Sequence, residues 1–146
     1  MNRVIGYSFG VLILIGVCAV VTPIAVTHAS ELVADHLAQS EVSAVAEAQE
    51  TASQISGVYL PESTLLTEMW LPASPTRTIH ASADGSCYVT ASISTAGHVF
   101  WLDNDNLGPR DYISGVSAST CVDLPALVVE LSRAALAAPA LNPGYR

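Results

Sequence analysis

The fold is decided by a stretch near the N-terminus, Val11-Leu-Ile-Leu-Ile-Gly-Val-Cys-Ala-Val-Val21, which is almost entirely aliphatic. It lies within a longer segment, residues 4–30, that contains no Asp, Glu, Lys or Arg. A helix needs about 20 apolar residues to cross the roughly 30 Å hydrocarbon core of a bilayer. The sequence therefore predicts a transmembrane helix over residues 7–30, preceded by a short leader, residues 1–6.

The charges on either side of this helix predict its orientation. Arg3 is the only charged side chain before it, and all thirteen Asp and Glu residues follow it, beginning with Glu31. Basic flanks stay in the cytoplasm. We therefore expect a single-pass membrane protein in contact with the lipid bilayer, with a cytoplasmic N-terminus and residues 31–146 outside the cytoplasm.

Overall charge limits the partners of the outer part. The net charge is −8, there is no lysine, and the five arginines are scattered along the chain. A nucleic-acid backbone is bound by clustered basic side chains. Direct binding of nucleic acid is therefore not expected.

The three cysteines divide by context. Cys18 falls in the middle of the predicted span, where it is interpreted as a small apolar packing residue. Cys87 and Cys121 fall in the outer part, where disulfides persist. We predict a disulfide between Cys87 and Cys121, with two unrelated buried thiols as the alternative.

Residues 1–29 admit other interpretations. Thr27-His28-Ala29 resembles a signal-peptidase site, but a signal peptide has an apolar region of only about 7–15 residues, and this one is longer. A lipoprotein anchor at Cys18 is rejected because Gly16-Val17 precedes it and apolar residues follow. An uncleaved anchor and a secreted domain released after Ala29 both stay open.

The start of the chain also resembles a known signal. Gly6-Tyr7-Ser8-Phe9 follows a six-residue leader with Arg3 and precedes the aliphatic run, which is similar to the class III signal of type IV pilins and pseudopilins. The resemblance implies cleavage after Gly6 by a prepilin peptidase, which leaves Tyr7, commonly methylated in this family, as the first residue. The fifth mature position, normally a glutamate used in assembly, is Val11 here, as in a few minor subunits located at filament tips.

A proline interrupts the predicted span. Pro23 removes one helical hydrogen bond and predicts a kink. Pilin-like helices also carry a proline in the middle of the helix, although prolines are common in membrane helices generally.

Residues 31–57 are predicted to extend the helix beyond the membrane and to end at Gly57. At 100° per residue, an apolar stripe occupies an arc of about 120°, and Glu41 is the one acidic exception near it. The stripe consists of Val33, Ala34, Leu37, Ala44, Val45, Ala48, Ala52 and Ile55. A helix that packs on its own domain and one that packs on other subunits both fit this pattern.

The outer domain, residues 58–138, reads as a proline-rich connection with one short helical turn, then strands, then a helix. Alternation and turn residues predict strands over Arg77–Ala81, Ser86–Ser94, His98–Leu102 and Arg110–Val116. Asp123 and Pro125 predict the start of a final helix that reaches Arg133. The expected fold is α+β, a long N-terminal helix packed on a small antiparallel sheet, closed by the disulfide and followed by a flexible tail, residues 139–146.

The order of these elements is similar to the globular heads of pilins from Gram-positive bacteria. The likeness covers residues 1–121 and includes the hairpin from Cys87 to Asp103 followed by Cys121. It implies a structural subunit of a surface filament, or of a secretion or uptake pseudopilus, whose partners are other pilin-like subunits. The alternative is a monomeric, membrane-anchored binding or accessory domain.

The sequence carries no pattern typical of an enzyme and implies no cofactor. His28, His36, His80 and His98 lie too far apart to indicate a closely spaced ligand pair and are expected at isolated surface or boundary positions. Asp103-Asn-Asp-Asn106 begins like a calcium loop, but position five is Leu107 and no glutamate closes it. A polar hairpin loop is the preferred interpretation, and no metal site is predicted.

Aromatic residues leave two interpretations open. Trp70, Phe100 and Trp101 could form an exposed binding patch. Alternating strand positions more often belong to a core, so we expect at least one of Phe100 and Trp101 to be buried.

Overall fold

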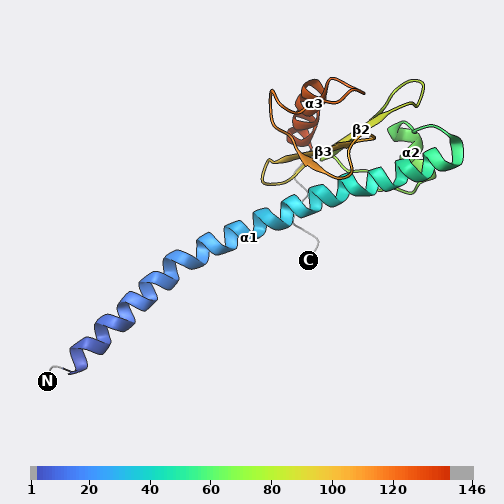
Figure 1. Cartoon of the computed structure of the whole chain (residues 1–146). Helices are drawn as coiled ribbons and strands as arrows, with labels where there is room; N and C mark the ends of the chain where they lie inside the picture. Colours follow the sequence, from blue (N-terminus) through green and yellow to red (C-terminus); the bar gives the residue numbers. More distant parts are fainter. Residues whose placement is uncertain (1–2, 139–146) are drawn as a thin grey trace. The chain divides into compact units, whose positions relative to one another are not determined.

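The computed structural model describes the backbone of residues 3–138 and the side chains of residues 28–138. The fold is α+β (Figure 1), and its elements in order are α1 (Arg3–Ser56), α2 (Glu62–Glu68), β1 (Arg77–Ala81), β2 (Tyr88–Ile93), β3 (Val99–Asp103), β4 (Arg110–Asp111) and α3 (Leu124–Ala137). The chain divides into two compact units, Met1–Ala34 and Asp35–Arg146. The predicted fold class, a long N-terminal helix with an antiparallel sheet and a short C-terminal helix, is confirmed.

Four strands form one antiparallel meander in the order β1-β2-β3-β4. In the centre of the sheet, Thr90 lies opposite Ile79 on one side and Leu102 on the other. The predicted bounds of β1 are confirmed, and those of β2 and β3 are each correct to within two residues.

The fourth strand is shorter than predicted, so the expectation of a strand over 110–116 is wrong beyond Asp111. Tyr112 still donates its N–H to the Val99 carbonyl, at 2.8 Å. The next N–H, of Ile113, instead donates to the Ser117 hydroxyl at 2.8 Å. Gly115 then adopts a φ of 76° and turns the chain.

One face of the sheet is covered by α1, from Asp35 onward (Figure 1). The buried positions of the helix follow a three-four spacing typical of a helix packed along one stripe: Ala38, Val42, Val45, Gln49 and Ala52.

The predicted apolar stripe of α1 is therefore only partly correct. Val45 and Ala52 are buried, whereas Val33, Leu37, Ala44 and Ile55 are exposed. The helix therefore carries two apolar stripes, a buried one that packs on the sheet and an exposed one that includes Leu37, Ala44 and Ile55. A polar contact determines which of the two packs on the sheet. Glu41 accepts hydrogen bonds from the hydroxyls of Ser92, at 2.7 Å, and Ser74, at 3.0 Å. Periodicity alone contains no information about this contact.

The other face of the sheet is covered by α3, so the sheet is the middle layer of three (Figure 1). Successive residues of a strand point to opposite faces. Trp101 accordingly packs with Leu124, Leu127, Val128 and Leu131 on the α3 side. Phe100 packs with Ala38 and Val42 on the α1 side. Both aromatic residues are core, in agreement with the second interpretation of the sequence.

The ends of the helices follow the predicted signals. Gly57 has a φ of 80°, and its N–H donates to the Ser53 carbonyl at 2.8 Å, which ends α1 as predicted. Asp123 caps α3, and its carboxylate accepts from the N–H of Ala126. This helix continues four residues beyond the predicted Arg133, to Ala137.

Gln49 fastens the segment after α1 to the helix. Its side chain is fully buried, which is costly for an amide unless both of its polar atoms are paired. Gln49 Nε2 donates to the Leu60 carbonyl at 2.8 Å, and Gln49 Oε1 accepts from the Leu60 N–H at 2.9 Å. The pair of bonds holds the start of the proline-rich connection against α1.

Candidate functional site

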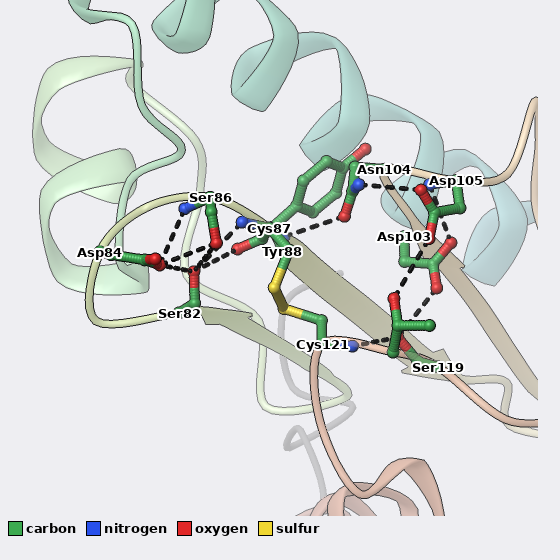
Figure 2. The surroundings of a disulfide bond; sticks show 11 residues. Ser82, Asp84, Ser86, Cys87, Tyr88, Asp103, Asn104, Asp105, Ser119 and Cys121 are labelled. Carbon is green, nitrogen blue, oxygen red and sulfur yellow. Dashed lines mark hydrogen bonds between the residues drawn. A yellow bond between two sulfur atoms is a disulfide. The ribbon is translucent and has the colours of Figure 1, made fainter.

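The predicted disulfide between Cys87 and Cys121 is confirmed (Figure 2). The two Cα atoms are 5.7 Å apart, and the residues are separated by 34 positions in the sequence. Cys87 immediately precedes β2, and Cys121 lies three residues before α3. The bond thus ties the start of the central hairpin to the segment that leads into the helix on the other sheet face.

A polar turn precedes Cys87 (Figure 2). The Asp84 carboxylate accepts from the Ser82 hydroxyl at 2.7 Å, and from the Ser86 hydroxyl and backbone N–H at 2.8 and 3.1 Å. These hydrogen bonds lower the pKa of Asp84 to about 2. Gly85 has a φ of 67°, and there is no space beside it because a Cβ would lie 2.7 Å from Val58 Cβ. The turn therefore requires glycine.

Asp103 organises the loop on the other side of the disulfide (Figure 2). Its side chain is only 3% exposed, and it accepts from the Ser119 hydroxyl at 2.8 Å and the Asp105 N–H at 3.2 Å. The Asn106 amide also donates to it. These bonds satisfy the buried carboxylate, and they join the loop after β3 to the segment before Cys121.

This network explains the predicted polar loop. The Asp105 carboxylate accepts from Thr120 at 3.2 Å and from the Asn104 amide at 3.1 Å. The Asn104 carbonyl oxygen accepts from the Tyr88 N–H at 3.4 Å. The oxygen-rich run after β3 therefore closes the loop by hydrogen bonds within the protein. Within residues 28–138, no group of three or more His, Cys, Asp or Glu side chains has an arrangement that could hold a metal ion.

Two cavities flank this loop. One, of about 410 Å³, is lined by side chains of both charge signs, including Arg110, Asp105 and Asp111. The other, of about 640 Å³, lies between α1 and the loop after β3. Its lining includes Glu47, Glu50, Tyr59, Tyr88, Asn104 and Leu107. Volumes of this size suit a small ligand or a few side chains of a partner.

Two tyrosines form the aromatic wall of the larger cavity. The rings of Tyr59 and Tyr88 have centroids 4.8 Å apart and are tilted by 58°, a favourable geometry for an aromatic pair. Figure 2 shows the Tyr88 ring pointing away from the neighbouring disulfide, toward the side of the sheet that packs on α1. Burial, with smaller contributions from Tyr59, Asp103 and Glu50, raises the pKa of Tyr88 well above its ordinary value.

The histidines occupy isolated, exposed positions, as expected. His98 Nδ1 lies 2.8 Å from Asp35 Oδ2, so the β2–β3 turn contacts α1 there. The hydrogen bond to His98 is the largest cause of a lowered pKa of Asp35. His28 Nδ1 lies 3.6 Å from Glu31 Oε2 within α1. His36 and His80 are exposed.

Several predicted residues lie outside the described side chains: Gly6, Tyr7, Val11, Cys18 and Pro23. The same holds for most of the predicted span, 7–30. Within the part of the chain searched, no helix has both the length and the apolar character needed to cross a bilayer. The predicted leader, 1–6, and tail, 139–146, also fall outside the described side chains.

Of the three aromatic residues considered for a binding patch, Trp70, Phe100 and Trp101, only Trp70 is exposed. It is 90% exposed and, unusually for a residue with a side chain, has a φ of 55°. Phe100 and Trp101 are buried on opposite faces of the sheet. The three therefore do not form one patch.

Comparison with models of known protein families found no match, and a comparison with curated proteins found none either. The larger cavity is the feature that the sequence did not indicate. Its lining residues come from α1, from the segment after α1, from β2, from β3 and from the loop after β3, so no local motif unites them. The one signal in the sequence is the pair of glutamates Glu47 and Glu50, close together in a chain without lysine.

Proposed function

We propose that the chain is a pilin-like structural subunit of a surface filament, or of a secretion or uptake pseudopilus. In this proposal the N-terminal hydrophobic helix holds the subunit in the membrane, with the N-terminus in the cytoplasm and the disulfide-closed head outside. Packing against the helices of other pilin-like subunits then provides the cohesion of the assembly. The role is structural and involves no catalysis.

The observation that carries the proposal is the second apolar stripe of α1. Leu37 is 60% exposed and Ile55 is 78% exposed, and Ala44 lies between them and is also exposed. The head already occupies a different stripe of the same helix, from Ala38 to Ala52. A helix that packs on its own domain only has no need for a second apolar stripe, whereas a helix shared with neighbours does.

The residue at position 11 specifies the kind of subunit. Val11 occupies the place of the glutamate that pilin-like subunits normally use in assembly. A chain without that carboxylate cannot form the corresponding ion pair with a neighbour. We therefore propose a minor subunit, placed at a tip or dependent on a partner subunit for its assembly.

Intact-mass analysis of the protein from its native membrane tests the proposal. Cleavage after Gly6 by a prepilin peptidase would give a mature chain that begins at Tyr7, with or without an added methyl group. A chain that begins at Met1 or Asn2 would contradict the proposal and support a monomeric, membrane-anchored accessory domain. A chain that begins at Ser30 would support a secreted domain.

The anchored accessory domain is the second candidate, and Val11 also favours it. A hydrophobic helix without the assembly glutamate can serve as a simple anchor. Chemical cross-linking in intact membranes separates this candidate from the first one, because an anchored monomer gives no adducts through α1.

A further inference from the structure

We propose that the cavity between α1 and the loop after β3 binds a lysine or arginine side chain presented by a partner protein. The binding group is the aromatic and acidic lining contributed by Tyr59, Tyr88, Glu47 and Glu50. This inference does not depend on whether the N-terminal helix assembles into a filament.

The acidic part of the site has no cation of its own. Glu47 and Glu50 are both exposed on α1 and line the cavity. Among the residues with described side chains, neither of them forms an ion pair, since the two pairs present are those of His28 and His98. The polar contact of the Glu50 carboxylate is with the neutral Gln54 amide, at 3.2 Å. Both carboxylates therefore attract an external cation.

The aromatic part of the site adds a second, independent feature. Tyr88 is only 5% exposed, yet its hydroxyl takes part in none of the hydrogen bonds of the described residues. The hydroxyl oxygen is not one of the buried unpaired atoms of the described residues, so it is accessible at the cavity that Tyr88 lines and can accept a hydrogen bond there. The faces of tyrosine rings also attract cations. The accessible, unpartnered hydroxyl and the two rings thus favour a bound cation with hydrogen-bond donors.

The shape of the lining matches the amphipathic character of a basic side chain. Lysine and arginine combine an apolar stem with a charged end. Leu102 and Leu107 line the same cavity as the two glutamates, and Leu107 is fully exposed at the loop after β3. In the proposed complex the stem packs on the leucines and tyrosines, and the charged end lies between the glutamates.

The charge of the chain indicates that the partner is a different protein. The chain has no lysine and a net charge of −8. Of its arginines, Arg77 is buried, which leaves Arg110 and Arg133 as the exposed arginines of the described part. A second copy would bring a strongly acidic surface toward this one, so a basic segment of another protein fits the site better.

The full-length chain in a neutral detergent allows a direct test by NMR. The probe is the peptide acetyl-Gly-Lys-Gly-amide, and its control is the same peptide with norleucine in place of lysine, which keeps the stem and removes the charge. We expect the lysine peptide to shift the resonances of Tyr59, Tyr88 and Leu107, with weaker binding at higher salt. The norleucine peptide should bind clearly more weakly.

Two variants with the same change of charge locate the interaction. E47Q/E50Q should raise the Kd for the lysine peptide by about five-fold or more. E68Q/E130Q removes two exposed carboxylates that do not line the cavity and should leave the Kd unchanged. All four positions are exposed, so both variants should fold.

Three results would overturn the proposal. Equal weakening in the two variants would mean that the peptide is attracted only by the net negative charge. Equal binding of the norleucine peptide would mean that the cavity accepts apolar groups without regard to charge. The absence of shifts at the cavity residues with the lysine peptide would mean that this cavity does not bind a basic side chain.

Discussion

Removal of the disulfide should destabilise the head strongly. The bond closes a loop of 34 residues, and the chain-entropy relation gives about 3.8 kcal/mol of stabilisation at 25 °C for a loop of that length. Together with the part of α1 that packs on it, from Asp35 onward, the described head has roughly 100 residues, for which 1 kcal/mol corresponds to a shift in Tm of about 4–8 °C. The variant C87S/C121S should therefore unfold about 15–30 °C below the wild type.

Thermal unfolding followed by circular dichroism in detergent measures this shift. Wild-type protein with a reducing agent should unfold near the temperature of C87S/C121S, because both lack the same constraint. The variant C18S retains the pair and should unfold like the oxidised wild type. A shift of less than about 5 °C on loss of the bond would refute the reasoning, since it would mean that the sheet and α3 hold the loop without it.

Three further substitutions test the packing and electrostatics of the head. Gln49→Met leaves the Leu60 N–H and carbonyl unpaired in a buried place and should lower the free energy of unfolding by about 2–4 kcal/mol, measured by urea denaturation; an unchanged urea midpoint would contradict this. Gly85→Ala places a Cβ 2.7 Å from Val58 Cβ at a φ of 67° and should cost about 1–3 kcal/mol, whereas Gly97→Ala, with nothing within 4 Å of its Cβ, should cost less. The pKa of Asp84 is lowered from its ordinary value of 3.8 to about 2, so its stabilising effect is present above about pH 4 and is lost as the pH falls from about 4 to 2. The urea midpoint of Asp84→Asn should therefore fall less than that of the wild type over this pH range. Parallel curves for the two proteins would show that the Asp84 carboxylate does not contribute to stability.

The local signals of the sequence were sufficient for much of the fold. Arg77–Ala81 was predicted with its correct bounds, and Gly57 was predicted as the end of α1. The pairing of Cys87 with Cys121 was also correct. Each of these features depends on residues close in sequence or on a small number of alternatives, so pattern and residue type determine them.

The orientation of α1 could not be predicted because it depends on contacts between distant residues. Gln49 counts as polar in any periodicity, yet it is fully buried because Leu60 satisfies both ends of its amide. Thr90 and Ser92 are likewise fully buried on β2, where Ser92 bonds to Glu41 from 51 positions away. A prediction from the alternation of apolar and polar residues assigns such side chains to the exposed face of the sheet.

The larger cavity could not be predicted either, because it also depends on contacts between residues distant in the sequence. Glu47 and Tyr88 are far apart in the sequence, and they line one cavity only after α1 packs on the sheet. The run from Asp103 to Asn106 resembles the start of a calcium loop because its oxygen-bearing side chains are adjacent in the sequence. Their hydrogen bonds with one another and with Ser119 and Thr120 give them a structural role.

Photo-cross-linking from the exposed stripe of α1 tests the central claim, which is assembly through this helix. The photoreactive residue p-benzoylphenylalanine is placed at Leu37, which is 60% exposed, and in a control at Arg133, which is exposed on α3. Irradiation of intact cells should give covalent adducts with copies of the chain or with other pilin-like subunits at Leu37, and none at Arg133. A chain that remains monomeric after irradiation at Leu37 would contradict assembly through α1.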